Sequence, residues 1–163
     1  MSKTLLQETE YEEDAQKDKF LTFSLGTEYY GIEIKQVTEI IGIQAITGVP
    51  ELPDYIKGIV NLRGKIIPVM DVRLRFKKPF WEYNDRTCII VIDIHDVSIG
   101  LIVDSVSEVL SIPSEDIVPP PDVSKGANRY IKGIGKVGNA VKLLLDCDKL
   151  LNDSETDQLL HIQ

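Results

Sequence analysis

The chain has 163 residues, of which 43% are hydrophobic and 27% charged, a balance typical of a folded globular protein rather than a disordered one. Its 18 basic and 26 acidic residues give a formal net charge of −8, which disfavours a protein that depends on contacts with the phosphates of DNA or RNA. Two cysteines, Cys88 and Cys147, lie far apart and only two histidines are present, so we expect no structural metal site. We expect both cysteines to be buried thiols in a reducing compartment, and the sequence leaves open whether either has a redox role.

Residues 1–18 are acidic, and we expect them to form a flexible N-terminal tail. They lack the apolar core of a secretory signal, and no apolar run along the chain approaches the roughly 20 residues that a membrane span needs. The sequence therefore predicts a cytoplasmic protein with no direct insertion into a membrane.

The apolar composition predicts a mostly β fold, because Ile and Val together number 35 residues against 20 for Leu and Ala. β-Branched side chains fit a pleated sheet and lose rotamer freedom in a helix. Alternating or continuous apolar residues then predict strands in the segments 20–25, 30–34, 56–62, 65–70, 88–94, 97–103 and 140–145. The segment 36–41 is either a helical turn or a strand, and its residues do not separate the two.

Turn and capping residues punctuate these strands. Hairpin turns are predicted at Gly26-Thr27, Arg63-Gly64 and Gly138-Asn139. Asp71 can cap a short helix, residues 77–86 have the composition of a linker, and Ser154 can cap a short C-terminal helix. The strands that alternate most cleanly predict the core, which we expect to include Ile32, Ile34, Ile90, Ile92, Leu101, Leu143 and Leu145.

An internal repeat is the most informative feature of the chain. The residues Tyr55–Ile59 recur identically as Tyr130–Ile134, 75 residues later, and Val37–Glu39 resemble Val106–Glu108 at an offset of 69. The repeat predicts two copies of one β unit of about five strands. A small closed barrel is the natural form of such a unit, because closure removes exposed strand edges.

These observations predict a division of the chain into four segments. They are a tail at 1–18, a first barrel subdomain at 19–79, a second barrel subdomain at 86–151, and a C-terminal helix or tail at 152–163. Each barrel would be marginally stable alone, so we expect the two to pack against each other as one domain.

Motifs for catalysis are weak. The glycines of Gly133–Gly138 spell G-x-G-x-x-G, but the residues that follow predict a strand rather than the helix that a dinucleotide site requires. Glu39 and Glu108 are equivalent in the repeat and could support acid–base chemistry, but a structural or partner-binding role is favoured. His95 and His161 have no nucleophile suggested beside them, so we expect both at the surface. The sequence predicts no enzyme and no catalytic residue.

Four segments carry a resemblance to a known family: FLTFSLGTEYYGIEI, VTEII, YIKGIVNLRGKIIPVMDVR and YNDRTCIIVIDI. From about Phe20 to Leu151 the chain resembles the CheW-like domain family of chemotaxis coupling proteins. The motif at 58–64, followed by Ile67–Asp71, is highly specific to this family. The same domain occurs in the kinase CheA and in CheV, but this chain has no room for a kinase unit or a receiver domain, so it resembles the free-standing adaptors.

The resemblance implies two five-stranded SH3-like barrels with a hydrophobic core between them. It implies a scaffold without catalysis or cofactor, which bridges the regulatory domain of the histidine kinase CheA and the cytoplasmic tip of methyl-accepting chemoreceptors. Such a protein is cytoplasmic and is recruited to membrane receptor arrays. The oligomeric state in the array and the receptor or stimulus served remain open.

Family partner-binding positions fall on Val37, Glu39, Gly58, Arg63 and Val109. The chain departs from many family members at the proline-rich loop. Val118 and Val123 stand where those members carry an arginine and an aromatic residue that help to contact the kinase. The resemblance therefore leaves open which residues face the kinase.

Two of these positions can also be argued from the residues themselves. Gly58 follows the same residues as Gly133, which predicts close backbone approach or a positive φ, and we expect Gly58→Asp to weaken receptor coupling while the fold survives. Arg63 is not needed by its predicted turn, so a basic tip could bind an acidic receptor or kinase surface.

The alternative hypothesis is a protein that binds a small purine-type ligand in the cleft between the barrels. A nucleic-acid-binding barrel is a third hypothesis, opposed by the net charge of −8.

Overall fold

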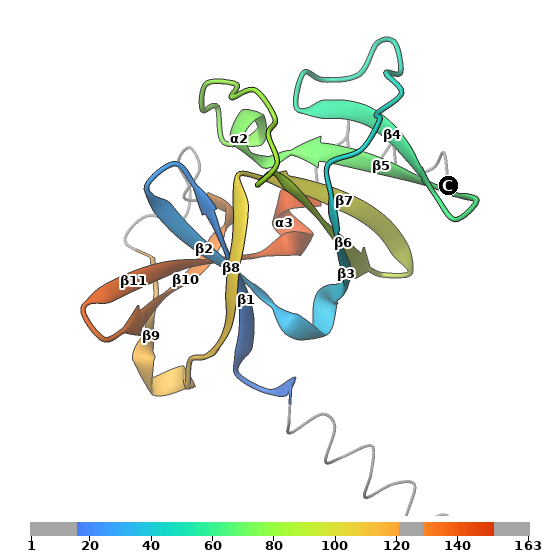
Figure 1. Cartoon of the computed structure of the whole chain (residues 1–163). Coiled ribbons are helices and arrows are strands. Elements are labelled where there is room, and N and C mark those ends of the chain that lie inside the picture. The colour runs from blue at the N-terminus through green and yellow to red at the C-terminus, as the bar shows by residue number, and fades with distance from the viewer. Residues whose placement is uncertain (1–15, 121–128, 152–163) are drawn as a thin grey trace, which may run out of the picture.

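The computed structural model describes residues 16–120 and 129–151, which form two β-sheets packed against each other (Figure 1). The mostly β fold class is confirmed. The helices are short: the 3-10 helices η1 (Ile34–Gln36) and η2 (Ser114–Asp116), and the α-helices α2 (Val72–Arg75) and α3 (Cys147–Leu151). The expected C-terminal helix or tail at 152–163, and most of the expected tail at 1–18, lie outside the described residues.

The first sheet, called sheet A, has six strands in the order β8-β1-β2-β11-β10-β9. Its strands are β1 (Lys19–Leu25), β2 (Glu28–Glu33), β8 (Ser105–Ser111), β9 (Ile117–Val118), β10 (Ile131–Val137) and β11 (Ala140–Leu145). Sheet B has five strands in the order β3-β6-β7-β5-β4. Its strands are β3 (Val37–Gly42), β4 (Ile56–Leu62), β5 (Lys65–Asp71), β6 (Cys88–Ile94) and β7 (Val97–Val103). The ambiguous segment 36–41 is thus mainly strand, preceded by a helical turn.

The internal repeat is also structural. Strands β1, β2 and β3 correspond to β6, β7 and β8, and the unit β4-β5-α2 corresponds to β10-β11-α3. The two copies share details of hydrogen bonding: Asp71 N donates to Tyr55 O at 2.7 Å, and Asp146 N donates to Tyr130 O at 2.8 Å. Both copies also have an irregularity in register beside the glycine that they share, between Ile56 and Gly58 and between the equivalent residues of β10.

The two copies exchange strands, so neither sheet coincides with one of the segments 19–79 and 86–151 that the repeat predicted as barrel subdomains. Sheet A combines the β1-β2 hairpin of the first copy with β8–β11 of the second, whereas sheet B combines β3–β5 with the β6-β7 hairpin. The chain crosses between the sheets at η1, after β2, and crosses back at Asp104, after β7. Apolar alternation identifies a strand but not its neighbour, so the repeat alone did not predict the exchange.

The largest hydrophobic cluster lies between the two sheets, as the resemblance implied. It contains Leu21, Phe23 and Ile32 from sheet A together with Ile90 and Leu101 from sheet B. Helix α3 adds Leu150 and lies between the sheets (Figure 1). Of the seven predicted core residues, five are fully buried, and the remaining two, Ile34 and Leu143, are half-buried against this cluster.

Neither sheet forms a continuous ring of paired strands within the described residues. Strands β8 and β9 are the edges of sheet A, and β3 and β4 are the edges of sheet B. One isolated β-bridge links the segment after β3 to the edge strand β4. In it Thr47 N donates to Ile59 O and Ile59 N donates to Thr47 O, both at 2.9 Å. The segment after β3 therefore reaches the far edge of its own sheet.

Gly58 makes this pairing possible. Its φ of +143° lies in a region that L side chains rarely adopt, and a Cβ built there would lie 2.0 Å from Thr47 O. The expected close backbone approach is therefore present. The same contact argues against the expectation that Gly58→Asp leaves the fold intact, since any side chain would collide with the backbone of Thr47.

No helix among residues 16–120 and 129–151 is long and apolar enough to cross a membrane. The same residues contain no cluster of metal-ligating side chains. Both cysteines are free thiols; Cys147 is buried, and burial raises its pKa to about 12, while Cys88 is half-buried.

We predict that the strand exchange makes the two halves interdependent. Fragments 1–83 and 84–163 each lack strands of both sheets, so neither should unfold cooperatively alone, whereas an equimolar mixture should recover the β signal and coelute. Circular dichroism and size-exclusion chromatography test this. A folded, monomeric 1–83 fragment would contradict the exchange.

We predict that Gly58→Ala lowers the free energy of unfolding by about 2 kcal/mol or more, because the new Cβ must displace the Thr47 backbone. Gly48→Ala is the matched control: a Cβ at Gly48 meets nothing within 4 Å, so its effect should stay below about 1 kcal/mol. Urea denaturation measures both, and equal effects would show that the Thr47 contact does not constrain the fold.

Candidate functional site

Two of the five predicted partner-binding residues contact each other. Arg63 Nη2 lies 2.6 Å from Glu39 Oε1, so the turn between β4 and β5 is joined to the edge strand β3. The Arg63 side chain is 71% exposed and that of Glu39 is 28% exposed. The basic tip expected from the sequence therefore carries an internal counter-charge. An exposed pair of this kind contributes little to stability, about 0.2–1 kcal/mol, and can exchange partners readily.

The hairpin turn positions Arg63. Arg63 and Gly64 have φ values of +53° and +86°, as a two-residue hairpin turn requires, and Gly64 N donates to Asn61 Oδ1 at 2.8 Å. The equivalent turn at Gly138-Asn139 is also present. An arginine at positive φ is unusual, because this conformation favours glycine or asparagine. The geometry of the turn therefore does not explain why this position carries an arginine.

Val37 and Gly58 have roles in the fold. Val37 opens β3, pairs with Ile92 of β6 and packs half-buried against the large core cluster. Gly58 is buried on β4 beneath Thr47. Of these two positions only Val37 offers a side chain for contact, and that side chain also packs against the protein core.

Val109 lies on sheet A, away from the other four positions in the topology. It is 49% exposed on β8, the edge strand that pairs with β1, where it faces Leu21 across the ladder. Its counterpart in the repeat is Ile40 on β3, which is 43% exposed. The structure therefore brings Glu39 and Arg63 together, places Val37 on the same strand as Glu39, and places Val109 on the other sheet.

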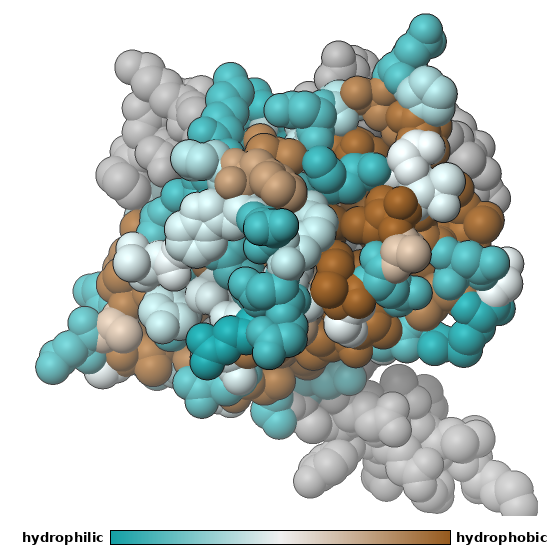
Figure 2. All heavy atoms as spheres, turned by 45° about the horizontal axis from the view of Figure 1, so that its top comes forward, coloured by the Kyte–Doolittle hydropathy of each residue, from teal (hydrophilic) through white to brown (hydrophobic). Residues whose placement is uncertain are grey.

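Sequence reasoning overlooked two exposed apolar residues on the strands that carry the Glu39–Arg63 pair and its turn. Ile40 follows Glu39 on β3, and Ile66 on β5 is 39% exposed just beyond the Arg63 turn. The sequence did contain a signal for Ile40, because side chains alternate along a strand and Ile40 therefore lies on the face of β3 opposite Glu39. Figure 2 shows apolar residues gathered on the right of this face, where sheet B lies in Figure 1.

The other candidate residues are dispersed. Glu108 is exposed on β8 and so lies on a different sheet from Glu39. His95 is exposed in the β6-β7 turn, with Nε2 3.0 Å from Asp148 Oδ1. Val118 is half-buried on β9, while Val123 and His161 lie outside the described residues.

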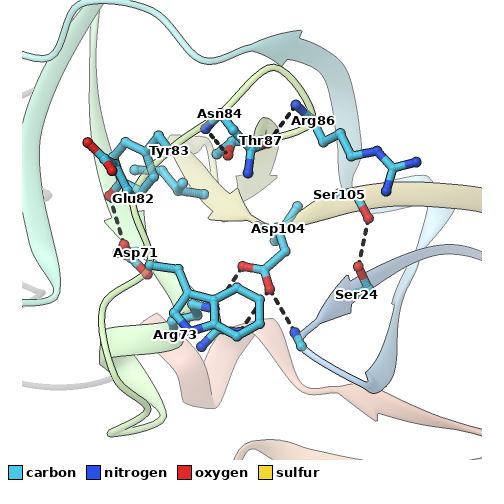
Figure 3. Close-up of a pocket in the computed structure, with 14 residues that line it drawn as sticks. Ser24, Asp71, Arg73, Glu82, Tyr83, Asn84, Arg86, Thr87, Asp104 and Ser105 are labelled. Atoms are coloured by element: carbon cyan, nitrogen blue, oxygen red, sulfur yellow. Dashed lines mark hydrogen bonds and ion pairs between the residues drawn. The ribbon is translucent and has the colours of Figure 1, made fainter.

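A polar cavity of about 210 Å³ lies where the 77–87 linker meets both sheets (Figure 3). At its centre Asp104 accepts hydrogen bonds from Arg73 Nε at 2.8 Å and Nη2 at 3.0 Å, and from Gly26 N at 2.7 Å. The guanidinium of Arg73, which is buried, also lies 3.5 Å from the ring centroid of Trp81. These contacts join α2, the β1-β2 turn and the crossover after β7.

The remaining polar groups of this cavity are bonded mainly to one another. Tyr83 Oη donates to Asp71 Oδ2 at 2.7 Å, and burial together with this bond raises the pKa of Tyr83. The hydroxyls of Ser24 and Ser105 lie 2.7 Å apart. The arrangement is suited to holding the linker and both sheets together rather than to proton transfer.

Comparison with known proteins agrees with the fold. The family model described as "CheW-like domain" matches residues 19–155. A chemotaxis protein CheW from Klebsiella aerogenes is 41% identical over 138 residues, which are 84% of this chain and 83% of that protein. A chemotaxis protein CheW from Bacillus subtilis is 34% identical over 142 residues, 86% of this chain and 90% of that protein.

A solved structure gives the same result. The crystal structure of the scaffolding protein TtCheW from Thermoanaerobacter tengcongensis matches with a TM-score of 0.79 and 37% identity, over 85% of this chain and 94% of that chain. A family match across residues 19–155, together with these identities, establishes the relationship. The chain belongs to the CheW-like domain family.

Proposed function

We propose that this protein is a non-catalytic adaptor that couples methyl-accepting chemoreceptors to the regulatory domain of the histidine kinase CheA. Membership of the CheW-like domain family over residues 19–155 is the observation that carries this proposal. The similar TtCheW is named a scaffolding protein, and the similar proteins from Klebsiella aerogenes and Bacillus subtilis are named chemotaxis proteins. In this role the protein acts in the cytoplasm and joins membrane receptor arrays through its partners.

The surface around β3 and the β4-β5 turn supports a protein-binding role. It carries the exposed Glu39–Arg63 pair, with the exposed apolar residue Ile40 on the opposite face of β3 and Ile66 just beyond the turn. Protein interfaces commonly combine apolar contacts with charged groups that set orientation and specificity. Arg63 can break its ion pair with Glu39 and bind a partner carboxylate in a bidentate manner. Glu39 is then also free to contact the partner.

A non-catalytic role is in keeping with the chemistry of the polar cavity. Asp104 and Asp71 there are held by Arg73 and Tyr83 in fixed hydrogen bonds, which leaves no free acid–base pair at its centre. We therefore assign no reaction and no cofactor to this protein.

The alternative function, binding of a small purine-type ligand, would use this same cavity. Its volume of about 210 Å³ and its lining by residues of both sheets favour this alternative. A purine that raises the melting temperature in a saturable manner would support it, since a ligand stabilises the state that binds it. No shift at millimolar purine would remove it.

We predict that Arg63→Asp weakens binding to a receptor fragment or to the kinase regulatory domain by about 2 kcal/mol, roughly 30-fold in Kd, because a partner carboxylate would then face a like charge. The free energy of unfolding should change by only about 1 kcal/mol, because the site is exposed. Calorimetric titration and urea denaturation measure the two quantities.

Two further variants separate the side chain from the fold. Arg63→Gly removes the guanidinium while relieving the positive φ, so stability should be kept and binding still weakened. Lys136→Asp, an exposed cation beside the equivalent turn of sheet A, should leave both affinities unchanged. If Arg63→Asp alters neither affinity, Arg63 is not part of a partner surface.

A further inference from the structure

A second cavity, of about 310 Å³, is surrounded by lysines and is independent of the surface described above. Lys17 lies two residues before β1, Lys19 opens β1, Lys35 lies in η1, and Lys132 lies on β10. Its floor is apolar, formed by Phe20, Ile117 and Leu144. We call this cavity the lysine pocket.

The lysine pocket carries more positive than negative charge, because its four lysines exceed its two carboxylates, Asp18 and Glu33. Glu33 forms an ion pair with Lys132, and Glu33 Oε2 lies 3.4 Å from Lys35 Nζ. Burial raises the pKa of Glu33, but the hydrogen bonds and charges of these two lysines outweigh burial and lower it. Among the described residues Lys17 and Lys19 have no ion-pair partner. On a chain with a net charge of −8, this pocket is a local excess of positive charge, which attracts anionic groups.

The repeat relates the lysine pocket to the polar cavity of Figure 3. Four residues of the pocket, Lys17, Asp18, Glu33 and Lys35, correspond at the offset of 69 to Arg86, Thr87, Ile102 and Asp104 of that cavity. The polar cavity is lined in addition by the chain's own Trp81–Asn84, an acidic and aromatic segment. The counterparts of Trp81–Asn84 are residues 12–15, which lie outside the described residues.

We propose that the lysine pocket binds the acidic segment of residues 10–14, Glu-Tyr-Glu-Glu-Asp, of the same chain. The four carboxylates of this segment are opposite in charge to the lysines, and Tyr11 supplies an aromatic ring whose chemistry matches an apolar floor. Gln16, which lines the pocket, is two residues from Asp14. An extended chain spans at most about 3.6 Å per residue, so all of residues 10–14 lie within reach. This short tether gives an effective concentration of about millimolar or more, which favours the chain's own segment over a separate peptide.

The test uses the full chain and a labelled peptide of residues 7–15 as the probe, followed by fluorescence anisotropy. The unaltered chain is compared with a neutralised variant carrying Glu10→Gln, Glu12→Gln, Glu13→Gln and Asp14→Asn. The neutralised variant should bind the peptide at least tenfold more tightly than the unaltered chain, because its own segment no longer competes. This affinity should fall as salt is added, as exposed charge contacts do.

Matched lysine variants in the neutralised background locate the site. Lys17→Gln, Lys19→Gln and Lys35→Gln together should weaken peptide binding at least tenfold. Lys57→Gln, Lys136→Gln and Lys149→Gln together change the net charge equally but lie outside the pocket, with Lys57 the counterpart of Lys132, and should change the affinity less than twofold. A melting curve for each variant verifies that it is folded.

Three results would overturn the proposal. Equal peptide affinities for the unaltered and neutralised chains would mean that residues 10–14 are not the occupant and that the pocket serves an acidic segment of another protein. Absence of binding to the neutralised chain would show that the pocket does not take acidic peptides. An equal loss in both lysine triples would show that net charge alone attracts the peptide. None of these results depends on coupling to receptors or kinase.

Discussion

Arg75 occupies the point at which the two copies of the repeat meet, and the rest of the structure depends on its contacts. Its buried guanidinium lies over the rings of Tyr55 and Tyr130, which are equivalent in the repeat, at 4.4 and 4.9 Å from their centroids. It donates to Leu150 O, the carbonyl of its own counterpart in the second copy. A row of aromatic rings with centroids 5.5–5.6 Å apart continues from this point through both copies: Phe23, Tyr30, Phe76 and Tyr130. A buried cation is tolerated there because aromatic faces and a carbonyl replace its water.

The strand exchange follows from this shared core. The β1-β2 and β6-β7 hairpins each bury an apolar face against strands of the other copy. The sequence could not predict this, because alternation within a strand does not identify the strand that pairs with it. Alternation did predict the strands themselves and five fully buried core residues, and the turn residues predicted the hairpin turn at Arg63-Gly64. The two sheets do not coincide with the segments 19–79 and 86–151, because pairing is decided at η1 and Asp104, where the chain changes sheets. Neither crossover has a residue pattern that distinguishes it from an ordinary turn.

The candidate surface was predictable in composition but not in arrangement. The family motif indicated Glu39 and Arg63 separately, and nothing in a separation of 24 residues shows that they form an ion pair. Gly58 was assigned to a partner from the same motif, while its φ and its contact with Thr47 O make it a requirement of sheet B. A substitution at Gly58 that abolishes coupling would therefore report on the fold before it reports on an interface. Arg63, which is exposed and not needed by its turn, is the position where binding and stability can be measured separately.

The two cavities show how one repeated backbone can acquire opposite chemistry. In the polar cavity of Figure 3, Arg73 and Asp104 neutralise each other within the fold. The counterpart of Arg73 is Asp148 and the counterpart of Asp104 is Lys35, so both charges are reversed in the other copy. Asp148 contacts His95 instead, and Lys35 contacts Glu33. Because Lys35 is not neutralised by Asp148, it joins Lys17, Lys19 and Lys132 in an excess of positive charge over the apolar floor. The linker residues Trp81–Asn84 line the first cavity from within the chain, and an acidic segment on the second would complete the equivalence of the two copies.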